Sequence, residues 1–223
     1  MRLIHAGVAQ PAQAIVAHEQ TSGKGQRGKS WQSTAGESLS FTLLLRPEPL
    51  QAIQAFQLLV AVALGAHTAV ETMSGAAFTI KWPNDIFWGD RKAGGILIEN
   101  VVHGSNWNWA LVGVGINVNQ QAFDPTLPHA VSLQQITGHG FDVRALALQL
   151  RSSILTEFDL LRVKGFTDRL DKYNQKLYGK GQIIRFRQQQ RVFEAEVEGV
   201  APNGYLLTRQ GHQFRFGEVE WLL

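Results

Sequence analysis

The sequence predicts an α+β fold in which a sheet with flanking helices is followed by a small β-barrel. Apolar residues recur at helical spacing along residues 50–73 and 143–163. Between these stretches, runs rich in Val, Ile and Trp are separated only by short turns, which indicates an antiparallel meander and not alternating βαβ units. After Gly179, a series of short strands joined by tight turns predicts the barrel. We therefore expect a larger domain over residues 1–176 and the barrel over residues 177–223.

The composition limits the class of protein. A chain of 223 residues can bury the core of one good-sized domain with a small appendage. The net charge of +3 is too small to argue for bulk nucleic-acid binding. Cysteine is absent and the histidines are scattered, so neither disulfides nor a metal centre held by the protein is predicted. No apolar run reaches the roughly 18 residues of a membrane span, and the N-terminus lacks a signal-peptide core, so we expect a cytoplasmic protein.

The first half of the chain is predicted to supply two strands and one long helix. Residues 14–18 and 38–45 are apolar runs bounded by turn residues, which is typical of strands. The helix over residues 50–73 is expected to end at Gly75. Its predicted inward face consists of Ile53, Phe56, Leu59, Val60, Ala63, Leu64 and Val70.

The rest of the larger domain is predicted to continue with strands and then helices. Strands are expected over residues 78–82, 86–88, 92–99 and 107–119, with short turns between them. Asp142 is predicted to cap the second long helix, because its side chain can accept from the free N–H groups of the first turn. Gly165 ends that helix, and a shorter helix is expected over residues 167–176.

The first candidate binding feature is Gly23-Lys24-Gly25-Gln26-Arg27-Gly28-Lys29-Ser30-Trp31. Glycine lets backbone N–H groups approach a ligand closely, and the cations beside them favour an anion such as phosphate. The stretch also fits the phosphate-loop pattern G-x-x-x-x-G-K-[ST]. That pattern requires a helix directly after the loop, whereas residues 38–45 are predicted to form a strand. The sequence therefore does not favour a phosphate-loop NTPase.

The second candidate feature is Lys81-Trp82-Pro83-Asn84-Asp85 with Lys92. It places a cation, an amide and a carboxylate around a rigid proline turn between two strands. Lys92 lies just past the next hairpin turn, so it can return to the same face of the sheet. Gly94-Gly95 then allows close approach of the backbone to a ligand. A polar hairpin with solvated charges is the competing interpretation.

Together these segments resemble the biotin protein ligases. That family has a G-R-G-R-x-G loop preceded by Gln and followed by Trp, then K-W-P-N-D, then R-K-x-x-G-I-L. The matching segments are Gln20 with residues 23–31, residues 81–85, residues 91–97 and the strand end 113–117. The resemblance runs from about Ile15 to the C-terminus. It implies a domain akin to class II aminoacyl-tRNA synthetases, with a mixed sheet and flanking helices, then an SH3-like barrel.

The resemblance also implies the chemistry. The family joins biotin to ATP as biotinyl-5′-AMP and then transfers biotin to a lysine of the biotin carboxyl-carrier domain of a carboxylase. Biotin, ATP and Mg²⁺ are thus implied, with the metal carried by ATP and placed near Asp85. No winged helix precedes the domain, so the chain resembles the non-repressor type and neither DNA nor a membrane is an implied partner. The family often dimerises, which leaves a homodimer open.

The resemblance assigns roles to individual residues. Lys92 is the implied catalytic residue, because the family lysine contacts the biotin carboxylate and the α-phosphate. The implied biotin-binding residues are Gln20, Gly23, Lys24, Gly25, Gln26, Lys92, Gly95 and Ile96. The implied nucleotide-binding residues are Lys24, Gln26, Arg27, Trp31, Lys81, Asn84, Asp85 and Asn117. For Asp85, the competing interpretation is a structural role in stabilising the hairpin. The assignment requires Lys92 to share a cleft with residues 23–28.

Two alternative functions stay open. A lipoate ligase or an octanoyltransferase has a related fold, but lacks K-W-P-N-D in this form. The other alternative is a non-catalytic or impaired biotin ligase paralogue. It is motivated by an Asp-Ser-Thr-Asn segment that family members carry some way before the glycine loop and whose hydroxyls contact biotin. In this sequence Met1 stands where the helix after that segment should already be under way. Either translation begins upstream or the chain is impaired, and we expect calorimetry to find weak biotin binding by the 223-residue chain.

Gln26 is a second departure from the family pattern, which usually has Arg at this position. Glutamine offers hydrogen bonds but no charge, so we predict weaker retention of the adenylate than an arginine would give. A Gln26→Arg variant is expected to release biotinyl-AMP more slowly in a stopped-flow dissociation measurement. An unchanged release rate would contradict the prediction.

Overall fold

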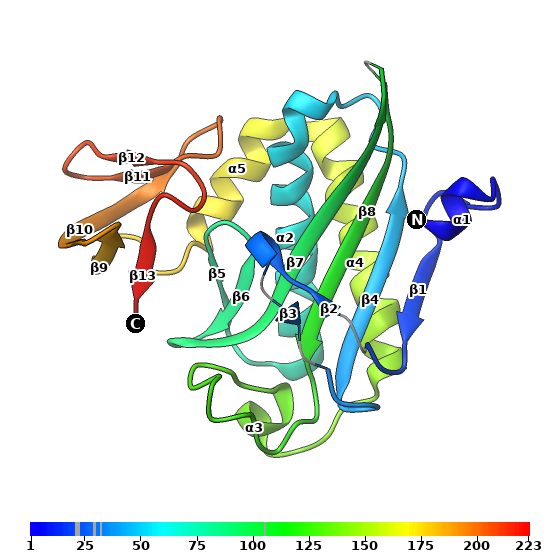
Figure 1. The fold of residues 1–223 in the computed structure, drawn as a ribbon, viewed down its shortest axis with the longest axis horizontal. Helices are drawn as coiled ribbons and strands as arrows, with labels where there is room; N and C mark the ends of the chain where they lie inside the picture. Colours follow the sequence, from blue (N-terminus) through cyan, green and yellow to red (C-terminus); the bar gives the residue numbers. More distant parts are fainter. Residues whose placement is uncertain (21–22, 29, 32, 105) are drawn as a thin grey trace.

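The larger sheet is a six-stranded antiparallel sheet with the strand order β1-β4-β8-β7-β6-β5 (Figure 1). The computed structural model describes residues 1–20, 23–28, 30–31, 33–104 and 106–223. The strands are β1 (Ala14–Ala17), β4 (Ser38–Leu45), β5 (Thr79–Lys81), β6 (Asp85–Trp88), β7 (Arg91–His103) and β8 (Asn106–Asn117). Every neighbouring pair in this sheet is antiparallel, and parallel pairing within the described part of the chain is limited to isolated bridges. The meander is therefore confirmed, and the mixed sheet implied by the resemblance is in fact antiparallel.

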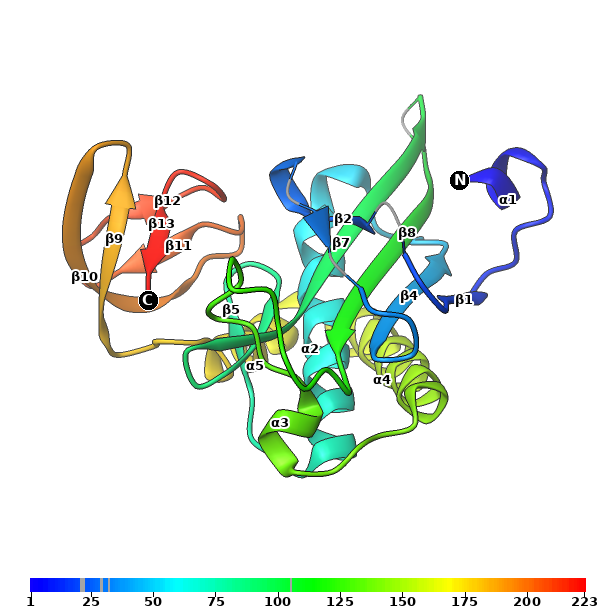
Figure 2. The ribbon, with the colours of Figure 1, turned by 60° about the horizontal axis from the view of Figure 1, so that its bottom comes forward.

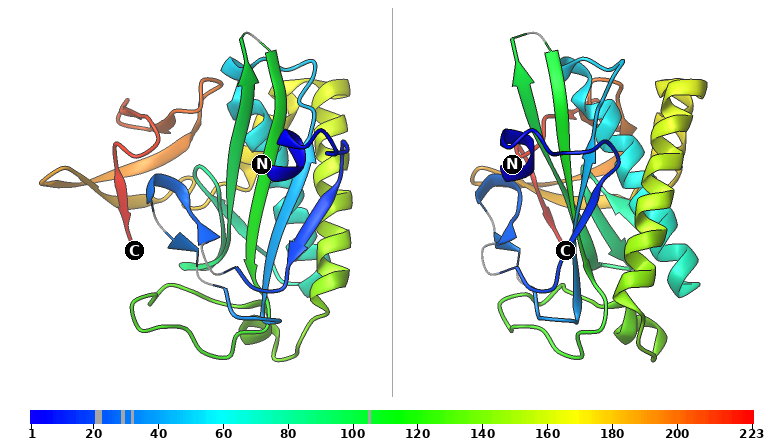
Figure 3. Two further views of the ribbon diagram at one scale, coloured as in Figure 1. Left: turned by 45° about the vertical axis from the view of Figure 1, so that its right-hand side comes forward. Right: turned by 90° about the vertical axis from the view of Figure 1, so that its right-hand side faces the viewer.

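The long helices cover one face of this sheet and leave the other face to the glycine loop (Figure 3). They are α2 (Ala55–Ser74) and α4 (Val143–Lys164), and α5 (Phe166–Gln175) follows them. The two long helices pack closely because Gly65 carries no side chain: a Cβ there would lie 2.6 Å from the Cα of Ile154. This packing turns one face of the sheet into the core and leaves the opposite face open.

The predicted boundaries of the helices are correct to within a few residues. One residue predicted on the inward face of α2 is wrong. Ile53 was expected to point inward but is 90% exposed. It lies in a short 3-10 turn, Ala52–Gln54, before α2 begins, so the helical periodicity does not extend to it. The stretch Ala52–Ser74 has the length and hydropathy of a membrane span, but 61% of its apolar window is buried inside the protein, as in a core helix.

Short elements surround the open face of the sheet. α1 (Arg2–His5) precedes β1, and the glycine loop forms β2 (Gly23–Lys24), a 3-10 turn (Gln26–Gly28) and β3 (Ser30–Trp31). α3 (Leu133–Thr137) was not predicted. Its start is nevertheless signalled in the sequence, because Ser132 and Gln135 form a capping box.

The C-terminal strands form a second, five-stranded antiparallel sheet beside β5 (Figure 2). They are β9 (Ile183–Gln188), β10 (Arg191–Val200), β11 (Leu206–Thr208), β12 (Gln213–Phe214) and β13 (Glu220–Leu222). Its buried side chains, such as Phe186 and Trp221, join the same apolar core as the helices. The indole Nε1 of Trp82 donates to the carbonyl of Gly204 at 3.0 Å and ties this sheet to the turn before Asp85.

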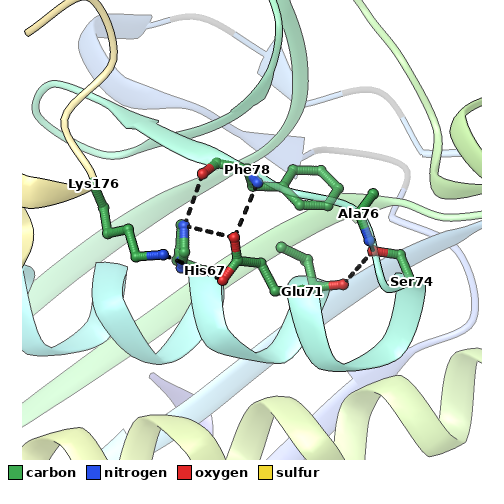
Figure 4. Close-up of polar contacts among 7 residues, drawn as sticks. His67, Glu71, Ser74, Ala76, Phe78 and Lys176 are labelled. Atoms are coloured by element: carbon green, nitrogen blue, oxygen red, sulfur yellow. Dashed lines mark hydrogen bonds and ion pairs between the residues drawn. The ribbon is translucent and has the colours of Figure 1, made fainter.

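A buried histidine fixes the end of α2 to the start of β5 (Figure 4). His67 is only 2% exposed, and its Nε2 lies 2.9 Å from the carbonyl oxygen of Phe78. Glu71 accepts from the backbone N–H of Phe78 at 3.1 Å and pairs with Lys176 at 3.5 Å. Burial lowers the pKa of His67, although the Phe78 carbonyl and Glu71 oppose this shift. The ring is therefore neutral in the folded protein and donates through Nε2–H.

The lowered pKa of His67 predicts a loss of stability in mild acid. The unfolded chain binds a proton at this residue near pH 6.5, whereas the folded protein resists it, so protonation favours unfolding. The contribution of neutral His67 to the free energy of unfolding should be fully present above that pH and should be lost as the pH falls below it. Urea titrations at pH 7.5 and 5.5 measure how much the free energy of unfolding falls between these two pH values. This fall should be smaller in His67→Gln, whose amide can donate to the same carbonyl, than in the wild type. An equal difference in both proteins would contradict the assignment.

Candidate functional site

The open face of the sheet holds a cavity of about 610 Å³. Its lining comes from the glycine loop, from α1 and from the five strands β1, β4, β8, β7 and β6, which lie side by side in the sheet. The residues from the loop and the neighbouring segment are Gln20, Lys24, Gly25, Gln26 and Trp31, and those from the strands include Ser40, Thr42, Asp85, Lys92, Gly95, Ile96, Glu99, Gly113 and Gly115. The functional assignment required Lys92 to share a cleft with the glycine loop. The structure confirms that Lys92 and the loop line the same cavity.

The floor of this cavity contains two adjacent glycines, Gly115 and Gly95. Ser40, Gly115, Gly95 and Asp85 face one another in register across four strands. A Cβ on Gly115 would lie 2.4 Å from the indole of Trp31, and a Cβ on Gly95 would lie 3.2 Å from the Lys92 amine. The two glycines therefore let an aromatic ring and a cation lie directly on the sheet.

Lys92 and Asp85 form an ion pair beside this floor. The Nζ of Lys92 lies 2.7 Å from Oδ1 of Asp85, and both side chains are partly exposed, at 37% and 24%. The pair comes from neighbouring strands, β7 and β6, so the sheet itself fixes the spacing of the two groups. The arrangement holds a cation in place and presents it to the cavity.

The glycine loop contacts the sheet through polar side chains. Gln26 Nε2 donates to the carbonyl of Ile96 at 3.4 Å, and Lys24 Nζ lies 3.9 Å from Glu99. Gln20 is held by its backbone N–H, which donates to Ser33 Oγ at 2.9 Å. The side chain of Arg27, a predicted nucleotide contact, lies outside the described part of the structure, as does Lys29.

The proline turn is anchored from several sides. The Asn84 amide donates to the carbonyl of Ile96 at 2.6 Å, and the Ile96 N–H donates back to the Asn84 carbonyl at 3.0 Å. Tyr173 from α5 donates its hydroxyl to the carbonyl of Pro83 at 2.9 Å. Burial raises the pKa of Tyr173, and the nearby Asp85 charge adds to this, so the hydroxyl stays protonated. These contacts fix the position of Asp85.

Two predicted nucleotide-binding residues do not line the cavity. The Lys81 amine lies over the rings of Phe87 and Trp221, at 4.9 and 5.7 Å from their centroids. Asn117 is buried and donates from Nδ2 to the carbonyls of Lys92 and Val131. In the structure both residues make contacts within the protein, and nucleotide binding by them stays a prediction.

Ser40 is a lining residue that the sequence reasoning missed. Its hydroxyl is buried and has no hydrogen-bond partner in the described residues, as is true of Gln26 Oε1 and Trp31 Nε1. The alternation of Ser40 and Thr42 with apolar residues along the strand was the available signal, because it places both on one face. The structure shows that this face is the cavity.

Within the described residues there is no group of three or more His, Cys, Asp or Glu side chains that could hold a metal ion. The fold and the cavity thus define an α+β protein with a small-molecule site on the open face of an antiparallel sheet. Residues 6–117 match the model of the biotin/lipoate A/B protein ligase family. This match covers half of the chain and includes the glycine loop, the proline turn and Lys92, and the chain belongs to that family.

Individual relatives agree with this placement. The chain is 32% identical over 203 residues to the bifunctional ligase/repressor BirA of Bacillus spizizenii, covering 88% of this chain and 62% of the relative. It is 37% identical over 134 residues to a Paracoccus denitrificans biotin–[acetyl-CoA-carboxylase] ligase, covering 57% of this chain and 55% of that protein. The structure of Aquifex aeolicus biotin protein ligase with biotin and ATP superposes with a TM-score of 0.82 at 27% identity, over 96% of this chain and 90% of that one. The chain spans less than two thirds of the length of both curated relatives.

Proposed function

We propose that this protein is a biotin–carrier-protein ligase that forms biotinyl-5′-AMP from biotin and ATP and then biotinylates a carrier lysine. The observation that carries the proposal is the Lys92–Asp85 pair, which lies over Gly95 in one cavity with the glycine loop. The relatives' names and the biotin and ATP in the Aquifex structure support the same chemistry. The proposal includes the carrier domain of a carboxylase as the protein substrate, a cytoplasmic location and a homodimer.

The first step brings two anions together. A biotin carboxylate oxygen attacks the α-phosphorus of ATP, the new P–O bond forms, and pyrophosphate leaves. Lys92 stabilises the charge that develops between carboxylate and phosphate, and Asp85 holds the Lys92 amine in place. In the second step the carrier amine attacks the acyl carbon of the mixed anhydride, AMP leaves with the bonding electron pair, and the amine loses a proton. In both steps the main contribution of the protein is to align the reacting groups in the cavity.

The unpaired polar atoms of the cavity lining favour biotin over lipoate. Gln26 Oε1 is an acceptor, Trp31 Nε1 is a donor, and the Ser40 hydroxyl is both. The cyclic urea of biotin carries two N–H donors and a carbonyl acceptor, which can pair with such a set. The dithiolane ring of lipoate offers no comparable groups and would leave them unpaired, which costs about 1–3 kcal/mol for each buried group.

Magnesium would enter with the triphosphate. Of the cavity side chains, Asp85 and Glu99 are carboxylates of the kind that Mg²⁺ prefers, and such sites use few protein ligands beside phosphate oxygens and water. Asp85 lies next to Lys92 and is the residue that we propose to face the metal. The ion would neutralise phosphate charge.

The test is biotin-dependent exchange of labelled pyrophosphate into ATP, followed by biotin transfer to a purified carrier domain. We expect exchange with biotin and none with lipoate or octanoate, and then a mass increase of the carrier at one lysine. Exchange driven by lipoate would identify the related lipoate ligase. If biotin drives neither exchange nor transfer, the impaired paralogue is the correct interpretation.

A further inference from the structure

Two tyrosines hold the two ends of β6, in the hairpin of β6 and β7 that carries the ion pair of the cavity. Tyr173, on α5, donates its hydroxyl to the carbonyl of Pro83 at 2.9 Å, in the turn before β6. Tyr178, which follows α5 in the chain, donates its hydroxyl to Oδ1 of Asp90 at 2.5 Å, in the turn after β6. One short segment from the C-terminal half of the chain therefore holds this hairpin at both ends.

The position of Tyr173 is set by the core and by the backbone that follows it. Its side chain is fully buried, and its ring meets the ring of Phe56 edge-on, with 6.4 Å between the centroids. Directly after α5, the carbonyl of Lys176 accepts from the N–H of Ile80 at 2.8 Å, and the N–H of Tyr178 donates back to the Ile80 carbonyl at 2.9 Å. These bonds join the end of α5 to β5, so the Tyr173 hydroxyl is presented to the hairpin from a fixed support.

The Pro83 carbonyl is a point at which the turn can control Asp85. Pro83 is buried and lies two residues before Asp85, which is the first residue of β6. The other anchors of the turn act at different atoms, since the Trp82 indole donates to the C-terminal sheet and the Asn84 amide donates to Ile96. A buried carbonyl that loses its donor must find another donor or move toward water. Removal of the tyrosine hydroxyl is therefore expected to shift the turn and the carboxylate that follows it.

The two tyrosines differ in which carboxylate lies near the hydroxyl. Burial raises the pKa of Tyr173, and the charge of Asp85 adds to this rise. Burial also raises the pKa of Tyr178, where the hydrogen bond and the charge of Asp90 add to it. Both hydroxyls therefore stay protonated and donate, but Tyr173 is the one within electrostatic range of the ion pair.

We propose that Tyr173 is a positioning residue for Asp85: its hydroxyl holds the Pro83 carbonyl and so keeps the Asp85 carboxylate at the Lys92 amine. The proposal deepens the proposed function, since it rests on Lys92 as the catalytic cation. Tyr173 does not line the cavity. It therefore acts on the rate of the chemical step without contacting the substrate.

The test uses Tyr173→Phe, which removes one oxygen atom and keeps the ring in the core. Tyr178→Phe is the matched control, because it removes the same atom from the other end of β6. Acetylation of Lys92 by a soluble acylating reagent is followed by mass spectrometry, with the exposed Lys164 as internal reference. We expect Lys92 to react about two- to fivefold faster in Tyr173→Phe, the range for loss of a partly exposed ion pair. Tyr178→Phe should leave that rate unchanged.

Kinetics supply the second measurement. Tyr173→Phe should lower kcat for biotinyl-AMP formation by about 10- to 100-fold, while KM for biotin and for ATP changes by less than about threefold. Tyr178→Phe should keep kcat near the wild-type value. A raised KM with an unchanged kcat in Tyr173→Phe would overturn the proposal, as would an unchanged Lys92 reactivity in the folded variant.

Two further outcomes are decisive. Equal effects of the two substitutions would show that the tyrosines only stabilise the hairpin, and a Tyr173→Phe chain that lacks the wild-type circular dichroism spectrum would show that the hydroxyl serves folding itself. Either result would overturn the positioning role. Wild-type protein that forms no adenylate would refute the proposed function, and the acetylation measurement would still decide the role of Tyr173.

Discussion

Replacing Lys92 with alanine is expected to lower the rate of biotinyl-AMP formation by about 100- to 1,000-fold, the usual effect of removing one preorganised charge-stabilising group. The ammonium is held 2.7 Å from Asp85 and lies on the bare backbone of Gly95, inside the cavity that contains the glycine loop. No other described lysine shares this position, since Lys24 lies across the cavity beside Glu99. Pre-steady-state formation of adenylate, followed by quenched flow, measures the effect directly.

Two further variants show which property of Lys92 accounts for the loss of rate in Lys92→Ala. Lys92→Arg keeps the charge but substitutes a larger planar group, so we expect only partial activity. Lys164→Ala removes one positive charge at an exposed site on α4 and should leave the rate as in the wild type. If Lys92→Ala raised only KM and left kcat unchanged, Lys92 would bind substrate without acting on the transition state.

The substitution Gly115→Ala, which adds one methyl group, is expected to weaken biotin binding by about 10- to 100-fold, because overpacking of a close contact costs about 1–3 kcal/mol. The added Cβ would lie 2.4 Å from the Trp31 indole, far inside van der Waals contact. Trp31 must then leave the floor of the cavity, and the strand pair of which it is part, β2 and β3, must move with it. Isothermal titration of biotin into Gly115→Ala measures the loss.

Gly113→Ala is the control for this prediction. Gly113 lies on the same strand and also lines the cavity, but a Cβ there would lie 3.2 Å from the carbonyl oxygen of Leu97 and not against the indole. We expect a loss of biotin affinity that is at least several-fold smaller than that of Gly115→Ala, because a smaller displacement relieves the contact. Equal losses in the two variants would show that Trp31 on Gly115 does not organise the site.

The fold was predictable because its signals are local. Residues 143–163 show helical periodicity with Asp142 as the cap, and the structure has α4 at Val143–Lys164 with Asp142 accepting from Arg144. The strands of the larger sheet were also found within a few residues, and the series of short strands predicted after Gly179 is present as β9 to β13. The glycine loop and the proline turn identified the family from their own residues, as the match over residues 6–117 confirms.

The details of the site were less predictable, because they depend on partners far along the chain. Lys81 belongs to the same motif as Asp85, yet its amine lies over Phe87 and Trp221 and does not line the cavity. Ser40 lines the cavity because β4 pairs with β8, which brings it opposite Gly115. Neither position follows from the neighbouring residues in the sequence.

The sequence by itself determined the long helices and the strands of the larger sheet, where the glycine loop lies, and which family the chain belongs to, since each of these is encoded in residues close together in the chain. Only the tertiary structure decided that Lys92 faces the cavity. Its direction depends on a β-bulge at Ala93, where the pairing of β7 with β6 changes from Ile86–Gly94 to Phe87–Lys92. A strand's period of two fixes the facing of a side chain only while the register is regular, and register is a property of the pairing of strands.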